Sequence, residues 1–122
     1  SNGVNATMNG TPSFTSNGTA SYFSFSGSNG FYFARPVSDD MTWGAWLKTA
    51  QTGGGVGQFY TSIQIFGGEM PGGTTDFSVV MGNGKLGFGN GPTDYTEYSN
   101  GTINDNLWHY VTVLFFTGKY YY

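Results

Sequence analysis

Apolar and polar residues alternate with a period of two along several stretches of the chain, as in strands that bury one face. The clearest stretch is 41–48, where the odd-numbered residues are apolar and the even-numbered ones are mixed. Segments 58–66 and 108–115 alternate in the same way, with Ile63 and Val111 on the apolar side. These three stretches are predicted to line one core between two stacked sheets. Shorter strands are predicted at 4–8, 20–25, 31–35, 76–81, 85–88 and 95–98.

Turn residues separate these stretches. Asn83–Gly84 lies between Val80–Met81 and Lys85–Leu86 and predicts a hairpin, because both central residues of a type I′ turn need positive φ. Gly or Asn interrupts most windows long enough for a helix, so no helix is predicted. The pattern therefore favours an all-β, antiparallel, two-sheet sandwich.

Composition agrees with a folded domain. The chain has 122 residues, of which 19% are aromatic and 9% charged, whereas disordered chains have many charges and few aromatics. This length suits one domain, so residues 1–122 are predicted to form a single one.

Charge and cysteine content exclude several classes of function. The four basic residues are scattered and form no stripe that could neutralise phosphates, which argues against a nucleic-acid partner. The chain has no Cys, so disulfides and thiolate metal sites are excluded. No apolar run approaches the roughly 20 residues of a membrane span, so no membrane insertion is expected.

Four segments in order carry a family resemblance. They are 22–27 (YFSFSG), 41–48 (MTWGAWLK), 83–86 (NGKL) and 107–113 (LWHYVTV). This series resembles the laminin-G-like domains, of bacterial and viral type, in the concanavalin A-like lectin/glucanase superfamily. The resemblance implies a jelly-roll connection of the two sheets. It also implies further strands after 119–122, so the chain is expected to lack its last strands. We expect either a fragment of a longer protein or a neighbouring subunit that covers the open sheet edge.

Catalysis is not expected, although the superfamily contains glucanases. Glycoside hydrolysis needs two carboxyl groups flanking the scissile bond, and the acids do not form the E-x-D-x-x-E arrangement of the related glucanases. Asp94 and Glu97 are three residues apart, so on a strand they face opposite sides. The single histidine, His109, alternates in phase with Val111 and is interpreted as a hydrogen-bonded core residue.

Calcium is the one cofactor that the resemblance suggests. Calcium binds several carboxylate and carbonyl oxygens. The loop 28–30, acidic in many relatives, has no carboxylate here. The candidate metal ligands are therefore Asp39, Asp40 and Asp94, and the alternative is that these are solvated loop acids.

Carbohydrate binding needs flat aromatic rings beside polar groups that bond to hydroxyls. Tyrosines alternate with polar residues near the predicted strand 95–98, and a structural role is the alternative for each. Trp46 falls on the mixed side of its strand with Lys48 and could instead pack in the sandwich. The residues predicted to bind a ligand are Tyr60, Asn90, Asp94, Tyr95, Glu97 and Tyr98.

Two functions follow as expectations. The first is a non-catalytic, extracellular module that binds a glycan or a surface receptor, on a virion fibre or a cell surface. The alternative is a structural building block that assembles with copies of itself in a fibre, filament or capsid decoration. Few charges and many tyrosines, which combine large contact area with a polar tip, suit both.

Overall fold

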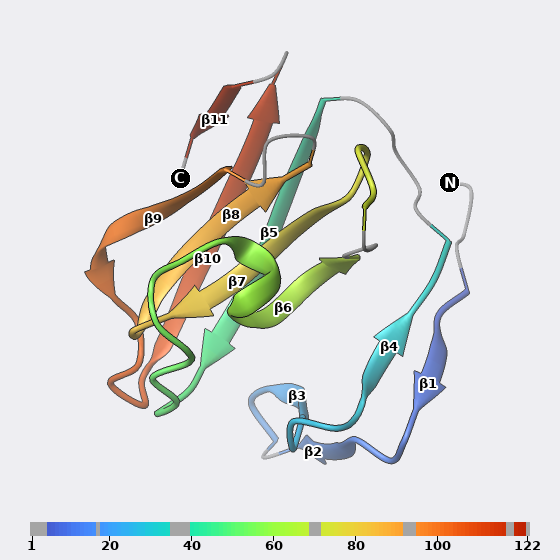
Figure 1. The fold of residues 1–122 in the computed structure, drawn as a ribbon. Helices are drawn as coiled ribbons and strands as arrows, with labels where there is room; N and C mark the ends of the chain where they lie inside the picture. The colour runs from blue at the N-terminus through green and yellow to red at the C-terminus, as the bar shows by residue number, and fades with distance from the viewer. Residues whose placement is uncertain are drawn as a thin grey trace. The chain divides into compact units, whose positions relative to one another are not determined.

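Strands and one short 3-10 helix make up the regular secondary structure (Figure 1). The computed structural model describes residues 5–16, 18–34, 40–68, 72–91, 95–116 and 119–121. These ranges contain no α-helix, and every pairing between their named strands is antiparallel. The predicted all-β antiparallel class is therefore confirmed. The chain divides into two units, Ser1–Ser38 and Asp39–Tyr122; the expectation of one domain stays a prediction.

The first unit consists of two small strand pairs. Ring contacts link its phenylalanines: the Phe23 centroid lies 5.1 Å from Phe14 and 4.8 Å from Phe31. The predicted strands 4–8, 20–25 and 31–35 are present with shifted ends, and Val4 and Arg35 lie outside the described residues. One further strand was not predicted, because four residues carry too little alternation. The pairs are β1 (Thr7–Asn9) with β4 (Gly30–Tyr32), and β2 (Ser13–Ser16) with β3 (Ser21–Ser24).

A three-stranded sheet forms one layer of the second unit. Its order is β11 (Lys119–Tyr121), β10 (Trp108–Phe116), β5 (Met41–Lys48). Strand β5 has the predicted bounds, and its side chains alternate between half-buried and exposed along its whole length. The period of two places the apolar residues on the core side, as predicted.

A four-stranded sheet forms the other layer. The predicted hairpin is confirmed, because Asn83 and Gly84 both have positive φ, 51° and 76°, and join β7 to β8. The strand order in this sheet is β6 (Ile63–Gly68), β7 (Phe77–Gly82), β8 (Lys85–Asn90), β9 (Tyr95–Thr102).

The two sheets pack face to face, with β5 and β10 behind β7 and β8 in Figure 1. The Trp43 and Phe66 rings stack across the interface at 5.3 Å, and Phe88 approaches Phe115 at 6.1 Å. Removing these apolar surfaces from water is the main favourable contribution to folding. The buried residues at the centre of this core are Val79, Leu86, Phe88, Val111 and Val113.

The predicted strand 58–66 is partly wrong. Its first part is a 3-10 helix, η1 (Phe59–Thr61), and β6 begins only at Ile63. A β-bulge between Gln64 and Phe66 places both Ile65 and Phe66 against the core, while Ile63 is 48% exposed instead of buried. The inserted residue breaks the period of two, which is why simple alternation gave the wrong side for Phe66. Ile63 pairs with Met81 on the core side of the sheet but lies on its edge strand, where it stays exposed.

A second packed layer covers the outer face of the four-stranded sheet. Figure 1 shows the loop that carries η1 crossing in front of β7 and β8. Phe59 of η1 is buried above Gly89: a Cβ on Gly89 would lie 2.6 Å from the Phe59 ring. Val80 and Ser78, on this outer face, are fully buried. The sheet is therefore covered on both faces, which explains the unbroken burial along β7.

Candidate functional site

Three of the predicted ligand residues lie together at the rim of the core, on β8 and β9. Asn90 pairs with Tyr95, and Glu97 pairs with the core residue Phe88, so all three share the core side of the sheet. The Tyr95 hydroxyl donates a hydrogen bond to the Glu97 carboxylate. Tyr95 is 53% exposed and Glu97 is half-buried. This group offers a ring with an amide and a carboxylate beside it.

Tyr98 points to the opposite face of the same sheet. It pairs with Gly87, and a Cβ on Gly87 would lie 2.7 Å from the Tyr98 ring. Its hydroxyl donates to the Gly57 carbonyl at 3.0 Å, accepts from the Gly57 N–H at 3.3 Å and lies 2.7 Å from Ser62 Oγ. Tyr98 therefore fastens the loop before β6 to the sheet, and its role toward a ligand stays a prediction.

Tyr60 lies on η1, within the layer that covers the outer face. It is 48% exposed, and its hydroxyl donates to the Gln58 side-chain carbonyl. Its ring packs edge-on against buried Phe59 at 5.9 Å. Tyr60 thus presents an accessible ring on an element separate from Tyr95 and Glu97.

The predicted metal ligands remain largely undescribed. Asp39 and Asp94 lie outside the described residues, and Asp40 is exposed immediately before β5. Within the ranges that the structure describes, no three His, Cys, Asp or Glu side chains gather as a metal site would require. Calcium stays a prediction of the family resemblance.

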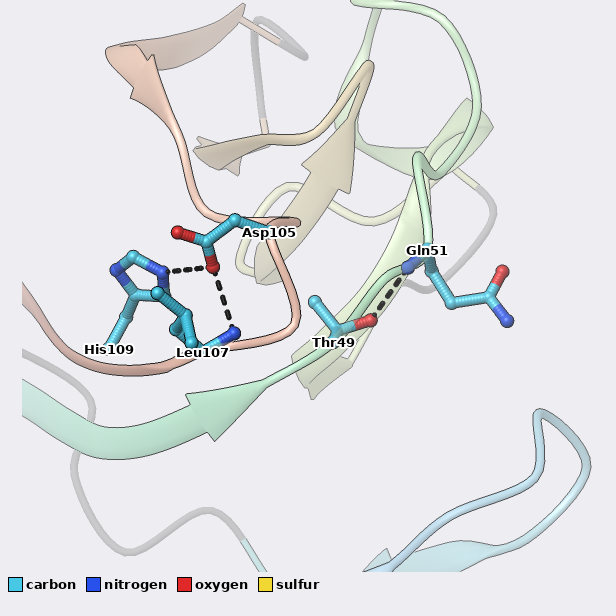
Figure 2. Close-up of polar contacts among 5 residues, drawn as sticks. All are labelled: Thr49, Gln51, Asp105, Leu107 and His109. Atoms are coloured by element: carbon cyan, nitrogen blue, oxygen red, sulfur yellow. Dashed lines mark hydrogen bonds and ion pairs between the residues drawn. The ribbon is translucent and has the colours of Figure 1, made fainter.

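The single histidine is half-buried and not enclosed in the core interior, and Figure 2 shows its ring beside Asp105. His109 is half-buried, and its Nε2 lies 2.8 Å from Asp105 Oδ1. The Leu107 N–H donates to the same carboxylate oxygen at 2.9 Å. These two hydrogen bonds, that of His109 first, lower the pKa of Asp105 below its usual value. The predicted hydrogen bond of His109 is therefore present, and it closes the turn before β10.

An aromatic surface that was not assigned as a site lies on the outer face of the three-stranded sheet. Trp46 of β5 and Tyr110 of β10 are paired across the strands, with ring centroids 5.4 Å apart. The two side chains are 63% and 61% exposed. Trp108, two residues from Tyr110 on the same face, is 45% exposed. We call Trp46, Trp108 and Tyr110 the aromatic platform.

Gly44 gives the platform its geometry. A Cβ at Gly44 would lie 2.7 Å from the Tyr110 hydroxyl, so the tyrosine ring extends across the strand over the missing side chain. Most of the Tyr110 side chain still faces solvent, since it is 61% exposed. The sequence already contained the signal, because Trp46, Trp108 and Tyr110 occupy even positions of two strands whose odd positions, apart from His109, are apolar.

Comparisons with protein-family models, with curated proteins and with solved structures give no match to this chain. Among the described residues, no helix is both long and apolar enough to span a membrane.

Proposed function

We propose that this chain is a non-catalytic, extracellular carbohydrate-binding module that holds its ligand on the aromatic platform. The fold in this proposal is the jelly roll of the laminin-G-like, concanavalin A-like domains. The two packed antiparallel sheets support it, together with the four sequence segments in family order. A virion fibre or a cell surface is the proposed location.

The observation that carries the proposal is the exposure of Trp46 and Tyr110 as a touching pair on a regular sheet. Large aromatic rings are usually withdrawn from water, and exposed clusters of them mark interaction surfaces. Strands β5 and β10 are paired along eight residues, so the rings stand on a rigid base. A rigid base lowers the entropy lost when a ligand binds.

Sugars fit this surface better than an apolar partner. The C–H face of a pyranose packs on an aromatic ring, while its hydroxyls need polar neighbours. The platform is flanked by the hydroxyl of Thr112 and the ammonium of Lys48, and the Tyr110 hydroxyl lies over Gly44 at the end away from Trp108. Rings with polar groups at their edges suit a ligand that is apolar on one face and polar at its own edges.

A glycan array, followed by titration of the best ligand, tests the proposal. Trp46→Ala and Tyr110→Ala should each weaken binding about tenfold or more, because each removes one stacked ring. Circular dichroism should show an unchanged β spectrum, since both side chains project from the sheet into solvent.

Tyr95→Ala and Tyr60→Ala serve as matched variants, because they remove exposed tyrosines at the sites first predicted. The proposal expects both to bind like the parent chain. Binding that survives the loss of Trp46 but not of Tyr95 or Tyr60 would move the site away from the platform. Absence of binding to every polysaccharide offered would contradict the function itself.

A further inference from the structure

Among the described strands, β5 lies at the edge of its sheet and has one long, regular side that pairs with no other strand. Among the described residues it pairs with β10 alone, and that pairing runs through all eight residues without a bulge. It contains no proline, and its only charged residue is Lys48 at its end. Bulges, prolines and central charges are common means of keeping an edge strand single, and β5 has none of them.

The sequence of β5 matches itself in one antiparallel register. When Gly44 faces Gly44 of a second copy, Thr42 faces Trp46 on the outer side of the sheet. On the core side, Trp43 faces Ala45 of the second copy. Each tryptophan thus meets a small side chain, Met41 meets Leu47 on the core side, and facing residues lie on the same side of the sheet, as strand pairing requires.

Charges at the two ends select the same register. Asp40 precedes the strand and Lys48 ends it, so centring on Gly44 sets Asp40 of each copy opposite Lys48 of the other. Centring on Ala45 would instead put Trp43 opposite Leu47 and Lys48 opposite Thr42, with no opposite charges facing. Opposite charges directly across an antiparallel pair are favourable, and like charges are not.

We propose that two copies of the chain associate through antiparallel pairing of β5, with Gly44 on the two-fold axis. The two three-stranded sheets then form one continuous six-stranded sheet. Because this axis is perpendicular to the sheet, both aromatic platforms lie on the same side. A polymeric ligand could then contact both platforms at once and gain in apparent affinity.

Sedimentation equilibrium on the whole chain over a range of concentrations tests the register through charge reversal. Lys48→Asp sets acid against acid at both ends and should raise the dimer dissociation constant about tenfold or more. Asp40→Lys does the same with two bases. The double variant Asp40→Lys, Lys48→Asp restores opposite charges in the same register and should recover the parent constant.

Lys85→Asp makes the same charge change on β8 and should leave the constant unchanged. A chain that stays monomeric at all concentrations overturns the proposal. So does a dimer that tolerates Lys48→Asp, or one that the double variant fails to restore, because its interface would lie elsewhere. Sugar binding is measured in a separate experiment, so a chain that does not dimerise would not contradict sugar binding by the platform.

Discussion

Tyr110 lies across Gly44 on the outer face of the three-stranded sheet, with its hydroxyl 2.7 Å from where a Gly44 Cβ would be. The contact explains why a glycine, which weakens strands, stands in the middle of β5. The hydroxyl end of the tyrosine side chain takes the space that a Cβ at position 44 would fill. The glycine and the tyrosine therefore act as a pair.

Gly44→Ala should displace the Tyr110 ring without unfolding the protein. The atom that must move is the far end of a side chain exposed to solvent, so we expect the free energy of unfolding to change by less than about 1 kcal/mol. The near-ultraviolet circular dichroism of the Trp46–Tyr110 pair should change. Glycan affinity should fall with it. An unchanged near-ultraviolet spectrum would show that Tyr110 does not lie over this glycine.

Tyr98→Phe should loosen the loop that covers the outer face of the four-stranded sheet. It removes the hydroxyl that bonds to Gly57 and lies beside Ser62, and leaves the ring in place. We expect a loss of about 1–2 kcal/mol in the free energy of unfolding, measured by denaturant titration.

Tyr95→Phe is the control for this change on the same strand. Its hydroxyl bonds to Glu97 at an exposed position, so its removal should cost less than about 0.5 kcal/mol. Equal losses for the two variants would mean that the Tyr98 hydroxyl does not fasten the loop.

Gly89→Ala should destabilise the packing of η1 on the sheet. The new Cβ would lie 2.6 Å from the Phe59 ring and 2.7 Å from Thr96 Oγ1, and Phe59 is buried and cannot move freely. We expect a loss of about 1–3 kcal/mol, the range for overpacked sites.

Gly101→Ala gives the comparison for this substitution. Nothing lies within 4 Å of a Cβ at Gly101, so its effect should stay within about 0.5 kcal/mol. Thermal unfolding of the two variants side by side would measure the difference. A Gly89→Ala protein as stable as the parent would contradict the close packing of Phe59 on β8.

Acid should weaken the turn that Asp105 closes. The hydrogen bonds from His109 and Leu107 lower the pKa of Asp105 in the folded chain below its ordinary value in an unfolded chain. A lowered folded pKa gives stability that is present above the unfolded pKa and is lost as pH falls through the folded one. Asp105→Asn should therefore be less stable than the parent at about pH 5, and the difference in their free energies of unfolding should shrink toward about pH 2.

Melting temperatures across this range would measure the effect. His109→Gln should remove part of the pH dependence that Asp105 causes, because the imidazole hydrogen bond is the larger influence on the carboxylate. A constant difference between the parent and Asp105→Asn at every pH would show that the carboxylate has no such linkage.

The residues that sequence analysis assigned to a ligand site divide in space. Asn90, Tyr95 and Glu97 lie together. Tyr98 directly follows Glu97 in β9, and because successive side chains of a strand point to opposite faces, it lies on the other face of the sheet. The sequence also placed Trp46 on the mixed side of β5 but could not say whether a second layer covers that side. Only the pairing with Tyr110 showed that the rings stand together in solvent.

Local sequence determined what backbone geometry alone controls: the alternation of β5 and β10, the positive φ angles of Asn83 and Gly84, and the all-β class. These features depend on neighbours along the chain. Tertiary structure decided the bulge before Phe66, the 3-10 helix at Phe59 and the hydrogen bond from the Tyr98 hydroxyl to the Gly57 carbonyl. Each depends on contacts with residues distant in sequence, such as Val79, Gly89 and Gly57, whose positions no local period encodes.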